Sequence, residues 1–128
     1  MSFMKMPKNK HDIYAVECLD KEMPENVIPL LPELMEWLKD MNWPVANAIL
    51  PLMIRYQDET TRIAMDILKK EQNDDIWKYW IIKHFVPALS DKNQRILFDS
   101  LERIANYPTK GEQVEEVNEV AKEYLLSR

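Results

Sequence analysis

Glycine is almost absent from this chain: Gly111 is the single example in 128 residues. Loops that hold phosphates or dinucleotides use several glycines, because their backbone approaches the phosphate closely and adopts positive φ angles. The scarcity of glycine therefore excludes P-loop and dinucleotide-binding chemistry.

Cysteine and histidine are also scarce. Cys18 is alone and cannot form an internal disulfide, and His11 and His84 are the two histidines. We expect Cys18 to be buried and inert, and His84 to be a hydrogen-bonded core residue. His11 falls in the first turn of a predicted helix, where a functional role is not expected. Catalytic and metal sites need several such groups in one place, so we predict no catalytic residue, no metal site and no cofactor.

Long apolar runs are missing as well. No stretch approaches the roughly 20 apolar residues that a membrane helix needs, and the first residues lack the pattern of a secretory signal. We therefore expect a cytoplasmic protein without a membrane contact. The net charge of -5 makes nucleic-acid binding unfavourable, because such binding depends on clustered Lys and Arg.

The length and composition are those of one globular domain. The chain is 46% hydrophobic and 30% charged, and 128 residues suffice for a single core. We expect residues 1–128 to form this domain, with residues 1–8 as a flexible N-terminal segment.

Apolar residues with helical spacing predict about seven helices. They cover residues 9–21, 29–40, 43–57, 58–68, 75–89, 91–107 and 109–125, and residues 24–28 are expected to be a connection because of the nearby prolines. Asn9, Asp58 and Asp74 are the expected caps of three of these helices. Asn42 or Trp43 is expected to cap the helix that begins near residue 43, with Pro44 in its first turn. Capping boxes are predicted at Ser90 and Asp91 with Gln94, and at Thr109 with Glu112.

No segment alternates with strand period, so the predicted class is all-α. Leu38, Leu68 and Leu101 lie late in the second, fourth and sixth predicted helices, at intervals of about 30 residues, which is near the period of helix-hairpin solenoids. We predict antiparallel hairpins stacked as a short HEAT-like α-α superhelix.

The stretch 37–46, with sequence WLKDMNWPVA, joins two of these helices and resembles the signature of a family of small bacterial proteins, a domain of unknown function. Residues 76–79, IWKY, resemble that family too. The resemblance extends from about residue 9 to residue 105. It implies an α-α superhelix of stacked hairpins without an assigned activity, and similar small proteins are suspected immunity partners of toxins.

The same stretch contains the first candidate contact residues. Trp37 and Trp43 flank Asp40 and Asn42 at the tip of the predicted hairpin. Packing between hairpins accounts for these two tryptophans, and equally for Trp77 and Trp80. An exposed tryptophan beside polar residues is also a natural binding anchor, because tryptophan dominates interface hot spots.

The last predicted helix contains the second set of candidate residues. Its acidic side chains are Glu112, Glu115, Glu116, Glu119 and Glu123. They form either a solvated face or a surface for a basic partner. Of these five, Glu112, Glu116, Glu119 and Glu123 are the predicted contacts.

We therefore expect a non-enzymatic protein-interaction module. By analogy, its role is that of an immunity protein that neutralises a bacterial toxin, and its partner is another protein with a basic domain. The alternative is a nucleic-acid-processing helical-repeat enzyme, which needs a basic groove with aromatic residues inside it.

Overall fold

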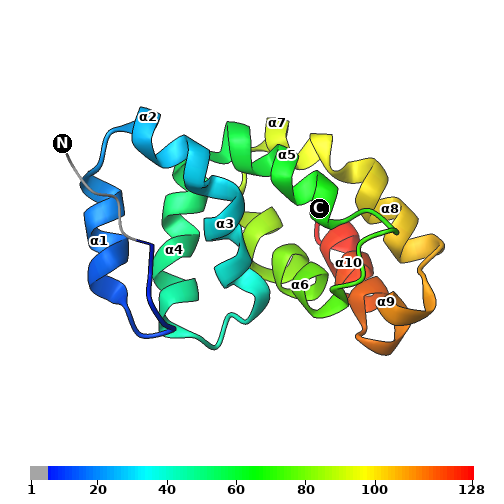
Figure 1. Cartoon of the computed structure of the whole chain (residues 1–128). Helices are drawn as coiled ribbons and strands as arrows, with labels where there is room; N and C mark the ends of the chain where they lie inside the picture. The colour runs from blue at the N-terminus through cyan, green and yellow to red at the C-terminus, as the bar shows by residue number, and fades with distance from the viewer. Residues whose placement is uncertain (1–5) are drawn as a thin grey trace.

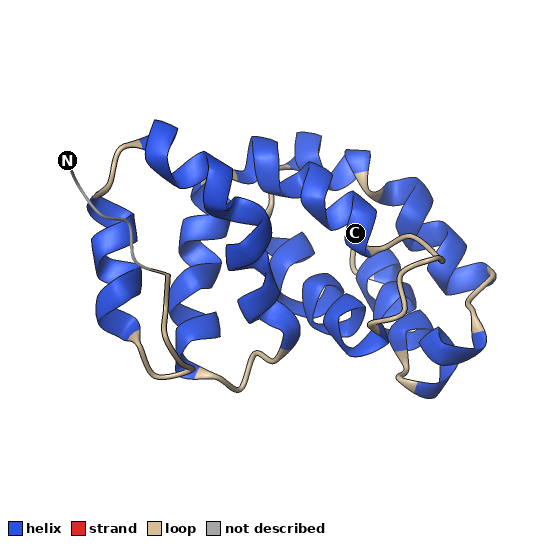
Figure 2. Cartoon of the chain, in the orientation of Figure 1, coloured by secondary structure: helices blue, strands red, loops and turns tan. Residues whose placement is uncertain are grey.

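The computed structural model describes residues 6–128, and these residues form helices and connecting loops without a strand (Figures 1 and 2). The predicted all-α class is therefore confirmed. Residues 1–5 of the predicted flexible segment 1–8 lie outside the described residues. Of the other three, Pro7 is buried.

The first part of the chain forms α1 (Ile13–Lys21) and a second, compound helical stretch. That stretch consists of α2 (Pro24–Val27), η1 (Ile28–Leu30), α3 (Leu31–Met35) and η2 (Glu36–Lys39). Two predictions were wrong here. Asp12 caps α1 instead of Asn9, and residues 24–28 are helical, because Pro24 occupies the first turn of α2, where a missing N–H has no cost.

The next two helices follow one another with almost no loop. α4 (Pro44–Arg55) begins after Trp43 with Pro44 in its first turn, as predicted. α5 (Gln57–Ile67) starts two residues later, with Tyr56 as the shared residue between them. The buried Thr60 hydroxyl donates to the Met53 carbonyl at 2.8 Å, which ties the two helices together at this corner.

The fifth predicted helix is continuous but changes its winding. α6 (Asp75–Trp80) is capped by the Asp74 side chain, as expected, and leads into the π-helical turn η3 (Ile81–Phe85) and the 3₁₀ turn η4 (Val86–Ala88). A π turn inside a helix holds one residue more than an α turn. The apolar side chains of this stretch are mostly buried, which is typical of a central helix.

Each of the last two predicted helices is broken once. The sixth becomes α7 (Asp91–Ile96) and α8 (Phe98–Asn106), and the seventh becomes α9 (Lys110–Val114) and α10 (Val117–Leu126). Thr109 and Glu112 form the predicted capping box. Ser90, one of the two residues predicted at the start of the sixth helix, caps α7 by accepting from the Asn93 N–H, whereas the predicted box of Asp91 with Gln94 is wrong.

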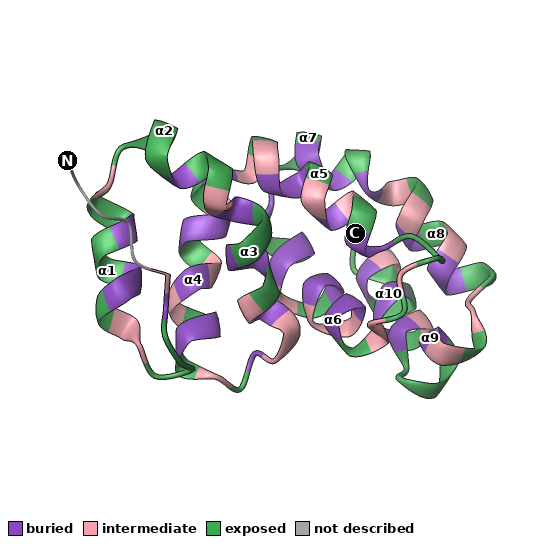
Figure 3. Cartoon of the chain, in the orientation of Figure 1, coloured by how far each residue is buried: buried purple, intermediate pink, exposed green. Residues whose placement is uncertain are grey.

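The helices form a row in Figure 1, and the chain returns on itself at its end. α1 packs on α4, α3 packs on α4 and α5, and α6 lies against η2. α10 then packs between α8 and the α6–η3 stretch, which closes the second half of the molecule. The buried residues lie on the faces that these contacts cover, and form one continuous apolar core (Figure 3).

Candidate functional sites

The two tryptophans of the signature stretch form an edge-to-face pair. Trp37 lies in η2 and Trp43 at the N-cap of α4, with ring centroids 5.7 Å apart and planes at 73°. Both side chains are half-buried. They line an open pocket of about 360 Å³, together with Met6, Pro7, Glu33, Glu36 and Lys39. We call this the tryptophan pocket.

Of the charged residues around the tryptophan pocket, Lys39 has acidic partners and Glu33 has no basic one among the described residues. Lys39 Nζ lies 3.3 Å from Glu36 Oε1 and 3.9 Å from Asp74 Oδ2. It also lies 4.8 Å from the centre of the Trp77 ring. Glu33 is exposed and has no ion pair within residues 6–128. The pocket thus combines aromatic faces with a carboxylate that has no counter-ion, an arrangement that attracts a cation.

Asp40 and Asn42 shape the loop between η2 and α4. The Asp40 carboxylate accepts a hydrogen bond from the Asn42 N–H at 2.9 Å, and the Asp40 carbonyl accepts from the Trp43 N–H at 3.1 Å. Asn47 closes the loop from α4 by donating to the Met41 carbonyl at 2.8 Å. Neither Asp40 nor Asn42 lines the tryptophan pocket, so they position Trp43 and stand beside the site.

The other two tryptophans serve the core and its edge. Trp77 is buried and its indole N–H donates to the Met35 carbonyl at 3.1 Å, as the packing interpretation predicts. Trp80 stacks on His84 with ring centroids 5.4 Å apart. His84 is half-buried, so the prediction that it lies in the core is wrong. Burial, and then the charge of Lys83, lower the pKa of His84 below its ordinary value.

Cys18 is exposed, which contradicts the expected burial. The buried face of α1 consists of Ala15, Val16 and Leu19, and Cys18 points away from it. A hollow of about 690 Å³ lies here, lined by Lys8, Asn9, His11, Asp12, Tyr14, Ala15 and Cys18. Its Asp12 carboxylate is already used at the start of α1, where it accepts from the N–H groups of Ala15 and Lys8.

Glu112 does not belong to the acidic surface that the sequence predicts. Its side chain is fully buried, because tertiary partners surround the carboxylate that caps α9. Lys78 Nζ lies 2.8 Å from Oε2, and Arg103 donates to both oxygens at 2.9 and 2.8 Å. The Thr109 N–H donates to Oε1 at 2.8 Å. We call these residues the Glu112 network.

The hydrogen bonds of this network set the protonation of Glu112. Burial raises the pKa of the Glu112 carboxyl. The hydrogen bonds from Arg103, Lys78 and the Thr109 N–H lower the pKa by more than burial raises it, so that the pKa is about 2. Arg103 also donates to the Leu68 carbonyl at 3.0 Å. The network therefore joins α6, α8, α9 and the end of α5 through one ionised, buried carboxylate.

The other acidic residues of this region are exposed. Glu115 and Glu116 lie at the break between α9 and α10, and Glu119 and Glu123 on α10. Glu116 has φ 60 and ψ 26, the left-handed conformation that non-glycine residues seldom adopt. This backbone angle turns the chain between the two helices. The sequence does not predict the turn, because no glycine or proline lies at this position.

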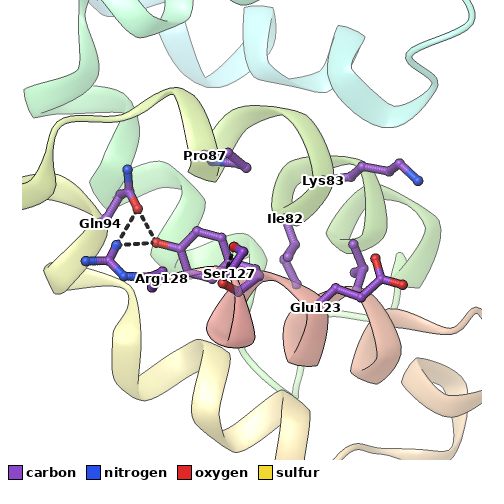
Figure 4. Close-up of a pocket in the computed structure, with 9 residues that line it drawn as sticks. Ile82, Lys83, Pro87, Gln94, Glu123, Ser127 and Arg128 are labelled. Atoms are coloured by element: carbon purple, nitrogen blue, oxygen red, sulfur yellow. Dashed lines mark hydrogen bonds between the residues drawn. The ribbon is translucent and has the colours of Figure 1, made fainter.

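A further pocket lies where α10 packs on η3, with Gln94 of α7 at its edge (Figure 4). Its volume is about 360 Å³, and it is lined by Ile82, Lys83, Pro87, Gln94, Val120, Glu123, Tyr124, Ser127 and Arg128. We call it the α10 pocket. Of these residues, the sequence marked Glu123 alone as a contact.

Three polar side chains form a closed triangle at one end of the α10 pocket (Figure 4). The Tyr124 hydroxyl and Arg128 Nη1 both donate to Gln94 Oε1, and Arg128 Nη1 also donates to the Tyr124 oxygen at 2.7 Å. Gln94 Nε2 donates to the Leu89 carbonyl at 2.7 Å. The sequence assigned Gln94 to a capping box. Nothing in the sequence indicates that its hydrogen-bond partner is Tyr124, 30 residues further along the chain.

Two further findings bear on the class of protein. Among residues 6–128, no three or more His, Cys, Asp and Glu side chains are placed to hold a metal ion. None of the helices in the described part of the chain is long and apolar enough to cross a membrane.

The fold and these sites define an all-α domain with several open pockets and a buried ionic network. The chain belongs to the family described as domain of unknown function DUF5071, whose model matches residues 5–125. The resemblance of residues 37–46 to such a family is thereby confirmed. Comparison with curated proteins finds no match.

Proposed function

We propose that this domain is a non-enzymatic protein-interaction module whose tryptophan pocket binds a basic side chain of a partner protein. One observation carries the proposal: Trp37 and Trp43 present half-buried rings at a large angle in the same pocket as the unpaired carboxylate of Glu33. A guanidinium or ammonium group over a tryptophan face contributes about 0.5–2 kcal/mol, and an adjacent carboxylate adds a charge-assisted hydrogen bond.

The charge of the pocket favours a protein partner over a nucleic acid. Aromatic residues also stack on bases, but single-stranded nucleic acid needs cations beside them for its phosphates. Here the tryptophans stand beside Glu33 and Glu36, and Lys39 is already engaged by Glu36 and Asp74. Phosphates are repelled from such a site, whereas a basic peptide is attracted.

The exposed glutamates support the same partner chemistry. Glu115, Glu116, Glu119 and Glu123 add negative charge at the other end of the molecule, and the whole chain has a net charge of -5. Charges of one sign steer an oppositely charged partner and accelerate association. We propose that these residues steer a basic protein, and that the tryptophan pocket provides its main contact.

The biological role that we propose is that of an immunity protein, which neutralises a toxin by covering a basic surface of it. This step rests on analogy with small helical proteins of that kind, and on the partner chemistry argued above. We also propose that the helical hairpins stack as a short superhelix. The packing of α1 on α4 and of α3 on α5 supports this arrangement.

A peptide titration tests the contact directly. An acetylated Gly-Arg-Gly-Arg peptide is compared with its citrulline counterpart, which has the same shape without the charge, while the indole N–H signals are followed by NMR. We expect the arginine peptide to shift the signals of Trp37 and Trp43. Trp77 is the internal control, because its N–H is held by the Met35 carbonyl. Equal shifts with the citrulline peptide, or none with either, would contradict the proposal.

Two variants separate binding from packing. Glu33→Gln removes the unpaired carboxylate of an exposed side chain, so we expect unchanged melting and several-fold weaker binding of the arginine peptide. Trp43→Ala should both destabilise the fold, by about 2–4 kcal/mol, and abolish binding. For the native partner, wild type and Glu33→Gln baits are compared by affinity capture with mass spectrometry. A basic protein recovered with wild type and depleted with the variant supports the role.

A further inference from the structure

Arg128 is a cation without a counter-ion in the described part of the chain. Its guanidinium lies 4.5 Å from the centre of the Phe98 ring and 5.7 Å from that of Tyr124, so it is stacked between aromatic faces. Its hydrogen-bond acceptors are the neutral oxygens of Gln94 and Tyr124. A positive charge held only by neutral groups retains its attraction for an anion.

Arg128 is an exposed residue whose guanidinium is positioned by the hydrogen bonds of the triangle. Gln94 is 9% exposed and is anchored by its bond to the Leu89 carbonyl, which leaves its Oε1 to accept from Tyr124 and Arg128. The triangle is closed by the bond from Arg128 to the Tyr124 oxygen. Such preorganisation lowers the entropy that binding must remove.

Part of the guanidinium remains available for a ligand. Both hydrogen bonds that the Arg128 side chain donates to residues 6–128 start from Nη1. Its contact with the Phe98 ring uses no N–H group, so the N–H groups of Nη2 and Nε have no partner among these residues. An arginine has five such donors in a planar fork that matches the two oxygens of a carboxylate. The fork lies at the rim of the α10 pocket, whose volume is about 360 Å³.

The rest of the pocket is suited to an uncharged, apolar group. Ile82, Pro87 and Val120 provide its apolar lining. Lys83 and Glu123 lie at the end away from Arg128 in Figure 4, and Lys83 Nζ donates to the Tyr79 hydroxyl at 3.2 Å. Their opposite charges offset each other, so Arg128 has the one uncompensated side-chain charge among the described residues that line the pocket.

We propose that the α10 pocket binds a monocarboxylate with a short apolar chain, its carboxylate on Arg128 and its chain against Pro87 and Val120. The same chemistry is offered by a free carboxylic acid and by the C-terminal carboxylate of a peptide that ends in an apolar residue. Nothing in this inference depends on the tryptophan pocket, which lies in the other half of the chain.

The test uses 4-methylpentanoate as the probe and 4-methylpentanamide as its uncharged control. Binding is followed by NMR at the side-chain amide of Gln94. We expect the acid to bind at least about tenfold more tightly than the amide, since a charge-assisted pair to arginine is lost in the amide. Equal binding of acid and amide, or no shift at millimolar acid, would overturn the proposal.

Three variants locate the charge. Arg128→Gln should reduce the affinity for the acid to that of the amide, and Arg128→Lys should lose most of it, because lysine has neither the fork nor the stacking. Lys122→Gln removes an exposed cation of the same helix and should leave the affinity unchanged. If Arg128→Gln binds the acid as wild type does, with its melting temperature retained, the site is not on Arg128.

N-acetylleucine distinguishes the two sources of the carboxylate. Tighter binding of N-acetylleucine than of 4-methylpentanoate assigns the pocket to a peptide C-terminus, and the reverse order assigns it to a free acid. Both orders support a carboxylate site that depends on Arg128.

Discussion

Lys78 Nζ lies 2.8 Å from Glu112 Oε2, and both side chains have no exposed surface. The pair joins α6 to α9 across 34 residues of sequence. Arg103 and Asp75 complete its surroundings, with Asp75 Oδ1 3.4 Å from the Lys78 ammonium. Charges at such depth are stable only while every partner is present.

Lys78→Met therefore should lower the free energy of unfolding by about 3 kcal/mol, because it leaves the buried carboxylate of Glu112 and the half-buried carboxylate of Asp75 without their common cation. Lys69→Met is the matched control. Its ion pair with Asp66 is similarly short, at 3.0 Å, but both side chains are mostly exposed, so we expect a change within about 0.5 kcal/mol. Urea denaturation measures both values. Equal losses for the two variants would show that burial does not decide the strength of the pair.

The low pKa of Glu112 predicts how stability depends on pH. Because its pKa is about 2 in the folded protein and 4.5 for a free side chain, folding favours the ionised form. The resulting stability, about 3 kcal/mol, is present above pH 4.5 and is lost as the pH falls towards 2. Urea denaturation of wild type and Glu112→Gln should give a stability difference that shrinks over this range. A difference that is constant from pH 7 to pH 2 would contradict the assignment.

Gly111 should resist substitution although it lies in a helix. A Cβ atom at this position would lie 2.2 Å from Asp75 Oδ2, so α9 could not approach α6 as closely. We expect Gly111→Ala to destabilise the protein by about 1–3 kcal/mol, despite the better helix propensity of alanine.

A double-mutant cycle checks the cause of that loss. In the Asp75→Ala background the obstructing carboxylate is absent, so Gly111→Ala should cost less there than in wild type. Equal costs in both backgrounds, measured by thermal denaturation, would assign the role of Gly111 to something other than its approach to Asp75.

Glu116 offers the opposite case, a position where glycine is missing. Its left-handed backbone is about 1–2 kcal/mol unfavourable for an ordinary residue and costs glycine nothing. Glu116→Gly should therefore raise the free energy of unfolding by up to about 1 kcal/mol after the entropy of the unfolded chain is counted.

Two controls isolate this backbone effect. Glu116→Gln removes the same charge without the conformational gain and should change stability little. Glu115→Gly places glycine one residue earlier, where φ is -93, and should destabilise. If glycine were equally harmful at positions 115 and 116, the left-handed angle would have no energetic consequence.

Local signals in the sequence predicted some helix starts and missed others. Asn9 and Asp58 do not cap the helices for which they were expected, since Asp12 caps α1 and α5 begins after Tyr56. Asp74, Pro44 and the Thr109–Glu112 capping box occupy the expected positions, because a cap depends on residues three or four apart. The breaks at Leu97 and Glu116 escaped prediction because neither contains glycine or proline. There, tertiary packing overrides the apolar period that otherwise indicates one long helix.

The sites were less predictable than the helices, since their partners are distant in sequence. The sequence around Glu112 is that of an exposed acidic face, but ion pairs with Lys78 and Arg103 hold Glu112 in the interior. Gln94 similarly has its decisive partners at the C-terminal end of α10. The proximity of Trp37 and Trp43 could be predicted from the sequence, because they are six positions apart and a tight loop joins them.

The π turn at η3 has a consequence for the length of the chain. Because each residue rotates an α-helix by about 100°, an added residue would normally turn one end of the helix away from the core. Here the wider turn absorbs that residue, so that Trp77 before it and Phe85 at its end are both buried. A variant that lacks the exposed Lys83 should therefore wind as plain α-helix and keep both buried faces. The turn is thus a position where the chain can change its length by one residue while the packing on both sides is kept.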